Sequence, residues 1–329
     1  MDMVSTISFI QANLQHSIAA SRLLSRAVSI KEIDMALIQE LWYREDRISN
    51  LNIQGYTLYS AGGTDRPRAC ILARNMTIWM LPGFSCRDIL AVLVKYVEDV
   101  AERWLVVCSA YLPYDSEDFP PSKEFEELVR YCQNENLYLV MVSESNAHHI
   151  AWGSTNCNDR GEALVEFLNS SNLEIFNQSN EPTFCSGYWQ EVIDITLGSF
   201  GLLENIKSCE VSSQPSLSDH RHILFTLRGS LPVRLIRNPR GTNWGSFRDG
   251  LRDRLERGPD MNVKHETGLG LAVHWVQQAL ISSYEENRPL SPVKTGRQYL
   301  KWTSELKSLR RGVRWPFNKC RTDNNPHSW

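Results

Sequence analysis

The sequence predicts an α/β fold in which two β-sheets pack face to face with helices outside them. Up to about residue 228, short apolar runs typical of strands alternate with fewer stretches in which apolar residues recur at helical spacing. Several predicted strands follow one another with no helix between them, which argues against a doubly wound parallel sheet. From about residue 229 onward the pattern changes to amphipathic helices.

The elements of the first part of the chain follow from the spacing of its apolar side chains. Residues 17–30 and 159–170 carry apolar positions on one helical face, and Ser122 is a suitable N-cap for a helix of about fourteen residues. Strands are expected where an apolar run ends at a turn residue or a proline. These runs are 6–12, 34–39, 56–60, 69–73, 88–96, 104–110, 137–142, 192–197 and 223–227.

A linker near 229–240, which contains Pro232 and Pro239, divides the chain into two predicted domains, 1–229 and 230–329. The second is expected to be basic and mainly helical, because apolar residues recur every three or four positions in two stretches. The region has little else with which to build a core, so a partner or a further domain is expected to cover these stripes. They are Trp244, Phe247, Leu251 and Leu255, and Trp302, Leu306, Leu309, Val313 and Phe317.

Composition limits the classes of function. With 329 residues, 42% of them hydrophobic and 22% charged, the chain has the composition of an ordinary soluble protein, and we expect neither a membrane span nor a secretory signal. Eight cysteines are scattered without a C-x-x-C, which indicates reduced thiols in an intracellular protein. Zinc is not expected, because the pair His148 and His149 lacks a third soft ligand at fixed spacing.

The net charge of −3 combines two regions of opposite sign. Residues 231–329 hold 18 Lys and Arg against 9 Asp and Glu, a balance of +9, and the rest of the chain has a balance of −12. The acidic excess fits a cation site, and the basic part fits non-specific affinity for nucleic acid. Two solvated surfaces of opposite sign explain the numbers equally well.

Polar residues end most of the apolar runs in the first domain. Carboxylates, amides, one phenol and one imidazole at strand ends suit the binding of a divalent cation against a phosphodiester, with activation of a water molecule beside it. These residues are Asn13, Glu40, Tyr111, Glu144, Asn146, Asp194, Asp219 and His220.

Each of these residues also has an ordinary structural explanation. Glu40 follows the apolar run 35–38 and is the best candidate for a metal ligand, yet a glutamate at a strand end is usually solvated. Asp194 lies in a predicted strand, where an unpaired carboxylate is costly to bury, and His220 would be a suitable partner. Asp219 can cap a turn, and Tyr111 can be a core aromatic with a tethered hydroxyl.

Seven short stretches occur in a specific order across residues 11–220: Gln11-Ala12-Asn13-Leu14-Gln15, Ile38-Gln39-Glu40, Ala110-Tyr111-Leu112-Pro113, Ser145-Asn146-Ala147-His148-His149, Glu181-Pro182-Thr183-Phe184, Ile193-Asp194-Ile195-Thr196-Leu197 and Ser216-Leu217-Ser218-Asp219-His220. With them the chain resembles the endonuclease/exonuclease/phosphatase superfamily, and more closely the apurinic-type endonuclease domain of non-LTR retrotransposons of the Jockey and R1 kind. The C-terminal part is similar to the segment that joins this domain to a reverse transcriptase, and no polymerase motif follows it.

The resemblance implies a four-layer α/β sandwich of two mixed β-sheets, with a C-terminal helical segment, and an enzyme that nicks DNA with Mg²⁺, or with Mn²⁺ as an alternative. It also implies a reverse transcriptase domain or element RNA supplied in trans, no membrane partner and a nuclear location. The implied roles are metal binding for Glu40, Asn13 and Asp219, phosphate contact for Asn146 and His220, orientation of His220 for Asp194, and stabilisation of the transition state for Tyr111.

One departure from the family pattern bears on activity. The pattern Gly-x-Asp-x-Asn is Val142-Ser143-Glu144-Ser145-Asn146 here, so Glu144 replaces the aspartate that orients the attacking water. One extra methylene displaces the carboxylate by about 1.5 Å, and a misplacement of about 1 Å can cost roughly 100-fold in rate. We therefore expect an intact fold with weakened nicking. The alternatives are a non-catalytic remnant that binds nucleic acid or a partner, and another phosphoesterase of the same superfamily.

Overall fold

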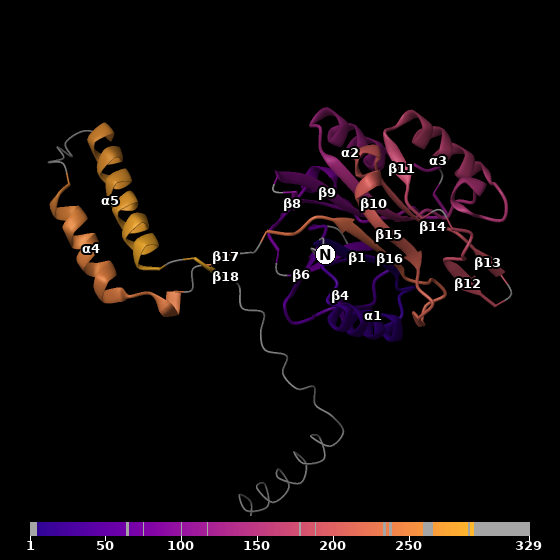
Figure 1. Cartoon of the computed structure of the whole chain (residues 1–329), viewed down its shortest axis with the longest axis horizontal. Coiled ribbons are helices and arrows are strands. Elements are labelled where there is room, and N and C mark those ends of the chain that lie inside the picture. Colours follow the sequence, from indigo (N-terminus) through magenta and orange to yellow (C-terminus); the bar gives the residue numbers. More distant parts are fainter. Residues whose placement is uncertain are drawn as a thin grey trace, which may run out of the picture. The chain divides into compact units, whose positions relative to one another are not determined.

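Two six-stranded mixed sheets form the centre of the first 229 residues (Figure 1). The structure is a computed structural model that describes residues 5–292, with gaps at 64–65, 75, 100, 117, 178, 188, 233–234, 237–238, 259–265 and 289. The first sheet contains, in spatial order, β15 (Ile206–Val211), β16 (Ile223–Arg228), β1 (Thr6–Asn13), β2 (Met35–Gln39), β6 (Ala69–Arg74) and β5 (Tyr56–Ser60). The second contains β11 (Leu173–Ile175), β14 (Asp194–Ser199), β10 (Tyr138–Glu144), β9 (Ala101–Tyr111), β8 (Ile89–Glu98) and β7 (Ile78–Met80).

Three apolar clusters separate four layers. The central cluster joins the inner faces of the two sheets, with Phe9 and Leu37 from the first and Val107 and Val140 from the second. A second cluster packs α1 (Ile18–Lys31) on the outer face of the first sheet. A third packs α2 (Lys123–Asn134) and α3 (Asp159–Ser170) on the outer face of the second sheet. The expected four-layer sandwich of two mixed sheets is confirmed.

Side-chain caps fix where the three helices begin. Ser17 accepts a hydrogen bond from the amide of Ala20, Ser122 from that of Phe125, and Asn158 from that of Gly161. Each cap pairs an amide that the first helical turn leaves without an intrahelical partner. The N-cap expected at Ser122 is confirmed, although its helix has 12 residues and is shorter than expected.

The two sheets are alike in one respect that positions the site. In each, one central pair of strands is parallel, β1 with β2 and β9 with β10, and the other pairs are antiparallel. The carboxyl ends of a parallel pair meet at the same edge of its sheet, so the residues that follow them gather there.

Polar side chains link the sheets between the apolar layers. Gln39 donates to the hydroxyl of Ser109 at 2.9 Å, and Gln11 donates to the carbonyl of Ser143 at 3.3 Å.

Two strand boundaries near the site differ from expectation. The strand expected over 137–142 continues to Glu144, and the one expected over 192–197 begins at Asp194. Ile193 is excluded from the ladder because its amide donates to Thr183 Oγ1 and its carbonyl accepts from Ser145. The sequence also missed the edge strands β7, β11 and β15. The first two have three residues each, and β15 (Ile206–Val211) carries several polar side chains, so all three give little apolar signal.

The remaining elements are short or lie after residue 229. They are the hairpins β3 (Tyr43–Arg44) with β4 (Arg47–Ile48), β12 (Phe184–Ser186) with β13 (Trp189–Glu191) and β17 (Leu235–Ile236) with β18 (Ser291–Pro292), the 3-10 turns η1 (Pro82–Phe84), η2 (Ile150–Trp152), η3 (Phe200–Asn205) and η4 (Pro239–Gly241), and the helices α4 (Trp244–Glu256) and α5 (Glu266–Asn287).

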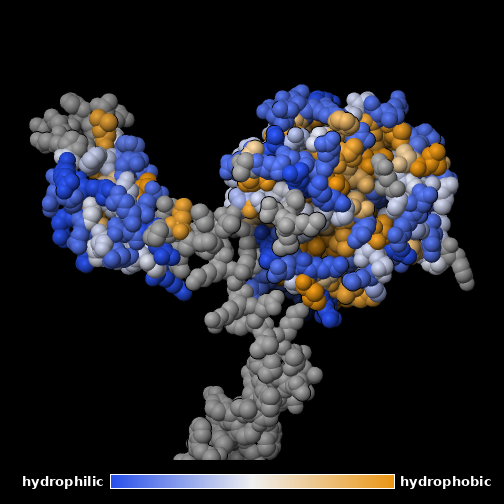
Figure 2. Space-filling model, viewed as in Figure 1, coloured by the Kyte–Doolittle hydropathy of each residue, from blue (hydrophilic) through white to orange (hydrophobic). Residues whose placement is uncertain are grey.

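The helices α4 and α5 pack as a pair. The ring of Trp244 lies 6.4 Å from that of Tyr284, and Arg254 forms an ion pair with Glu286. The visible face of this pair is mostly hydrophilic with scattered hydrophobic residues (Figure 2). The stripe expected from Trp244 to Leu255 is covered only in part, because both end residues stay exposed. The stripe from Trp302 to Phe317 lies outside the described residues.

Chain contacts divide the molecule after Val293, and the following residues lie outside the described part. The domain boundary expected at 229/230 therefore stays a prediction. None of the described helices combines the length and apolar character needed to cross a membrane.

Candidate active site

The polar residues singled out in the sequence lie where the central strands end. Asn13 and Glu40 end β1 and follow β2, and Tyr111 and Glu144 end β9 and β10. The backbone turns sharply at this edge, because Gln15, Glu40, Asn146 and Leu217 have φ of 47°, 48°, 47° and 59°. Residues other than glycine rarely adopt this left-handed conformation, which costs of order 1 kcal/mol and is often found at functional sites.

Three of these side chains form a row across the second sheet. Glu144 of β10 pairs in register with Tyr111 of β9 on one side and with Asp194 of β14 on the other. His220, from the loop before β16, completes the row. Its Nδ1 donates to Asp194 Oδ2 at 2.8 Å, and its Nε2 lies 3.6 Å from Glu144 Oε1. We call Glu144, Asp194 and His220 the buried cluster.

The charges of the buried cluster control its protonation. Burial by itself would lower the pKa of His220, but the negative charges of Asp194, Glu144 and Glu40 outweigh burial and raise it. The pKa of Glu144 is raised by burial first and then by the charges of Asp194 and Glu40, against the opposite effects of His220 and Asn13. The cluster therefore favours a protonated His220 beside Asp194.

Two amides hold the longer carboxylate of Glu144. Asn13 donates from Nδ2 to Glu144 Oε2, and Asn146 donates from Nδ2 to Oε1 at 3.4 Å. Asn146 also donates to the carbonyl of Leu112 at 3.1 Å, and the buried guanidinium of Arg160 donates to the carbonyl of Asn146 at 3.0 Å. These contacts engage one donor of Asn13 and both donors of Asn146, so Glu144 helps to orient the two carboxamides.

Glu40 and Tyr111 meet beside this row. The side chain of Glu40 is 17% exposed, and its Oε1 lies 3.6 Å from His16 Nε2. Burial, the charges of Glu144 and Glu40 and a hydrogen bond with Glu40 raise the pKa of Tyr111, so its phenol keeps its proton. The guanidinium of Arg68 lies 4.6 Å from the centre of the Tyr111 ring and also pairs with Asp88.

A bidentate contact fixes the loop that carries Asp219 and His220. Gln15 donates from Nε2 to Asp219 Oδ2 at 3.0 Å, and the amide of Asp219 donates to Gln15 Oε1 at 3.1 Å. The amide of Gln15 in turn donates to Asn13 Oδ1 at 2.7 Å. The end of β1 thus positions Asp219 through one carboxamide.

The oxygen atoms at this edge fit Mg²⁺ in kind. We call Asn13, Glu40 and Asp219 the oxygen-donor side, since they offer carboxylate and carboxamide oxygens, which hard divalent cations prefer. Among the described residues, the group in which three ligand atoms of His, Cys, Asp or Glu lie within 4.8 Å of one another is His149, Cys157 and Glu162, outside this edge. A cation at the oxygen-donor side would therefore also need carboxamide and water ligands. Mg²⁺ usually keeps several waters, and the donor set agrees with that habit.

The structure also shows residues that the sequence analysis gave no role. Gln15 and Thr183 lie in the quoted stretches, and Thr183 Oγ1 accepts from the amide of Asp194 at 3.0 Å. Asn177 donates to the carbonyl of Asp194 at 3.0 Å. Arg68 and Arg160 have no local signal in the sequence, because each reaches its partner across the fold.

Comparisons with known proteins agree with this fold. Residues 105–224 match the family model described as endonuclease-reverse transcriptase. No curated protein matches the chain. Among solved structures, the endonuclease domain of TRAS1, a telomere-specific non-LTR retrotransposon, is similar with 22% identity over 67% of this chain and 98% of that chain, at a TM-score of 0.57.

Two apurinic-type endonucleases are similar as well. The enzyme LMAP from Leishmania major has 12% identity over 69% of this chain and 89% of its own, at a TM-score of 0.54. The AP endonuclease from Archaeoglobus fulgidus has 14% identity over 67% of this chain and 99% of its own, at a TM-score of 0.51. The chain therefore carries a domain of the endonuclease/exonuclease/phosphatase fold, and residues 105–224 of that domain match the endonuclease–reverse transcriptase family.

Proposed function

We propose that the domain is a Mg²⁺-dependent phosphodiesterase that nicks DNA as the target-site endonuclease of a retrotransposon. The observation that carries this proposal is the row of Tyr111, Glu144 and Asp194, closed by His220 and joined to the oxygen-donor side by the hydrogen bond from Asn13 to Glu144. A protonated imidazole next to carboxylate and carboxamide oxygens is what a phosphodiester and a cation require together.

The residues of the site divide the work of hydrolysis. Glu40, Asp219 and the carboxamide oxygen of Asn13 would hold Mg²⁺, or Mn²⁺ in its place. When bound, the cation supplies charge neutralisation on the phosphoryl oxygens and lowers the pKa of a coordinated water.

The other side chains act directly on the phosphate. His220, held by Asp194, donates a hydrogen bond from Nε2 to a phosphoryl oxygen. Asn146 makes a second contact with that group by turning the donor of its long 3.4 Å hydrogen bond from Glu144 Oε1 to the phosphate. The protonated phenol of Tyr111 stabilises negative charge that develops in the transition state.

Glu144 stands where an attacking water must be oriented, and we propose that it weakens the enzyme. Burial raises the pKa of Glu144 and so favours the protonated carboxyl, which is a poorer acceptor for the water proton. Its oxygens are also engaged by Asn13 and Asn146 and lie near His220. Both effects lower the rate while the fold stays intact.

A binding-only role is the second candidate, because residues 231–329 carry a balance of +9. In that role the chain would hold DNA, element RNA or a reverse transcriptase supplied in trans, and it would act in the nucleus. Hydrolysis of another phosphoester is a third candidate, and no contact in the site favours it over DNA nicking.

Nicking of a supercoiled plasmid by the purified chain, with Mg²⁺, with Mn²⁺ and with EDTA, tests these alternatives. We expect slow conversion to the open circular form that needs the cation. Retention of the plasmid on the protein with no conversion under any condition would support the binding-only role and overturn the proposal.

A further inference from the structure

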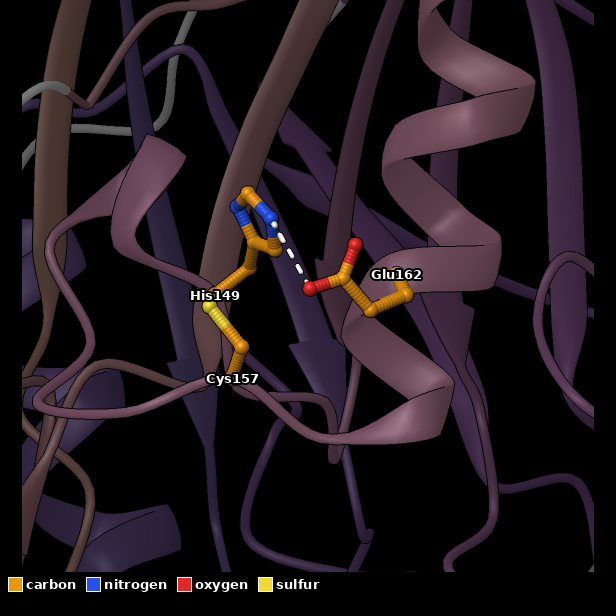
Figure 3. A group of neighbouring side chains, drawn as sticks. All are labelled: His149, Cys157 and Glu162. Carbon is orange, nitrogen blue, oxygen red and sulfur yellow. Dashed lines mark ion pairs between the residues drawn. The ribbon is translucent and has the colours of Figure 1, made fainter.

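A second group of ligand-type side chains lies outside the candidate active site, where η2 meets α3 (Figure 3). His149, Cys157 and Glu162 offer a nitrogen, a sulfur and an oxygen atom that all lie within 4.8 Å of one another. His149 Nε2 is 3.7 Å from Glu162 Oε1. Both Cys157 and Glu162 are exposed, so an ion can reach the group from solvent.

The backbone that carries the three residues is held in place without any metal. Both neighbours of Cys157 are tied to His148, because Asn156 Oδ1 lies 2.8 Å from His148 Nδ1 and the amide of Asn158 donates to the His148 carbonyl at 3.0 Å. Asn158 Oδ1 also accepts from the amides of His148 and Gly161, at 3.0 and 2.8 Å. The loop and the start of α3 are thus one connected unit.

A glycine brings Glu162 to His149. A Cβ atom at Gly161 would lie 1.9 Å from the carbonyl oxygen of His148, a distance that no side chain tolerates. With glycine at this position, the first turn of α3 approaches the backbone of residues 148–149 directly. Glu162 follows in that turn and faces His149 (Figure 3).

We propose that His149, Cys157 and Glu162 bind a zinc ion, with water as the fourth ligand. A nitrogen, a thiolate and a carboxylate suit Zn²⁺, whereas Mg²⁺ prefers oxygen alone. Zinc at His149 is not expected from the sequence, because Cys157 lies eight residues away and is brought near by the loop, not by a fixed motif.

Binding moves two protons. The Cys157 thiol loses its proton to solvent as the Zn–S bond forms. His149 Nδ1 accepts from the amide of Ala151 at 3.0 Å, so the neutral ring carries its proton on Nε2. When Nε2 binds the metal, that proton moves to Nδ1, which can then no longer accept from the amide of Ala151. Ala151 is exposed, so a water molecule can accept this hydrogen bond instead. Affinity therefore falls as the pH is lowered.

The test uses Co²⁺ as a spectroscopic probe on the full, reduced chain, with Zn²⁺ affinity measured by competition with a chromophoric chelator. We expect one equivalent of Co²⁺ to give the ultraviolet charge-transfer band of a cobalt–thiolate bond, and Zn²⁺ to abolish it. Cys157→Ser should remove the band, and Glu162→Gln should weaken Zn²⁺ binding at least roughly 10-fold.

Two controls separate this site from others. Cys86→Ser changes a half-buried thiol elsewhere, and Glu40→Gln removes the carboxylate proposed for Mg²⁺, so both should keep the band. No band in the wild-type chain, a band that survives Cys157→Ser, or Zn²⁺ affinity unchanged by Glu162→Gln would each overturn the proposal. The readout is binding, so the result stands whether or not the chain nicks DNA.

Discussion

The oxygen-donor side and the buried cluster are adjacent parts of one site with different environments. The side chain of Glu40 is 17% exposed, whereas those of Glu144, Asp194 and His220 are 6%, 2% and 4% exposed. Glu40 lies beside one exposed partner, His16, while the buried cluster packs two carboxylates against one imidazole. The partly exposed Glu40 can exchange ligands with solvent, whereas the buried cluster depends on its internal charge balance.

This difference separates activity from stability. A change at Glu40 removes a ligand and leaves little strain, because water can replace the oxygen of a partly exposed carboxylate. A change in the buried cluster leaves an uncompensated charge in the core, which costs much more than the pair contributes. Substitutions on the two sides should therefore be distinguishable by measuring both nicking and unfolding.

His220→Ala is expected to have the largest effect. It removes the imidazole that contacts the phosphate and leaves Asp194 and Glu144 without their positive partner. Nicking of supercoiled DNA should fall by roughly 1000-fold, and urea unfolding should show a loss of about 3–5 kcal/mol. Arg221→Ala is the matched control, because Arg221 follows His220 in the chain and its side chain makes an exposed ion pair with Glu181. Full nicking activity in His220→Ala would contradict the role given to the buried cluster.

Glu40→Gln should reduce activity but not stability. The variant loses a carboxylate proposed to hold Mg²⁺, so nicking should fall roughly 10- to 100-fold and the rise in melting temperature on adding Mg²⁺ should disappear. The free energy of unfolding without Mg²⁺ should change by about 0.5 kcal/mol or less. Glu45→Gln, at a side chain 86% exposed, should change none of these quantities. An unchanged Mg²⁺ response in Glu40→Gln would place the cation elsewhere.

Glu144→Asp should increase activity. The shorter side chain withdraws the carboxylate by about 1.5 Å and restores room for the attacking water, so the nicking rate should rise by roughly 10- to 100-fold. The same substitution made together with His220→Ala should bring no gain, because the phosphate contact is then missing. If Glu144→Asp nicks no faster than the wild-type chain, the inferred weakening is absent.

The sequence predicted the layers of this fold better than the details of its site. Buried strands such as 35–39 are recognisable from their continuous apolar runs, and the polar residues that follow such runs are then expected at the strand ends. The pairing of Asp194 with His220 was also expected, since a buried carboxylate needs a partner. The strands could be predicted because each depends on one segment of the sequence, and the Asp194–His220 pair because it follows from a single chemical rule.

Contacts that depend on how distant loops meet could not be predicted. Gln15 reaches Asp219 across 204 positions, and Arg68 reaches the ring of Tyr111 only because β6 begins near the end of β9. Cys157 lies near His149 because Asn156 and Asn158 hold the loop between them. In each case the sequence offers the side chain many possible partners, and the folded backbone brings only one of them within reach.

His222 offers the sharpest contrast with His220, which lies two residues away. Burial first, and then the charge of Lys31, lowers the pKa of His222 to about 4, whereas neighbouring carboxylates raise that of His220. An unfolded histidine has a pKa of about 6.5, so the unfolded chain binds the proton first as pH falls. The contribution of His222 is therefore complete above pH 6.5 and is lost by about pH 4, an effect of about 3 kcal/mol at most. Urea unfolding of the wild-type chain and of His222→Leu between these pH values should show a difference that shrinks with rising pH. A constant difference would mean that His222 is charged in the fold, and that its environment resembles that of His220 after all.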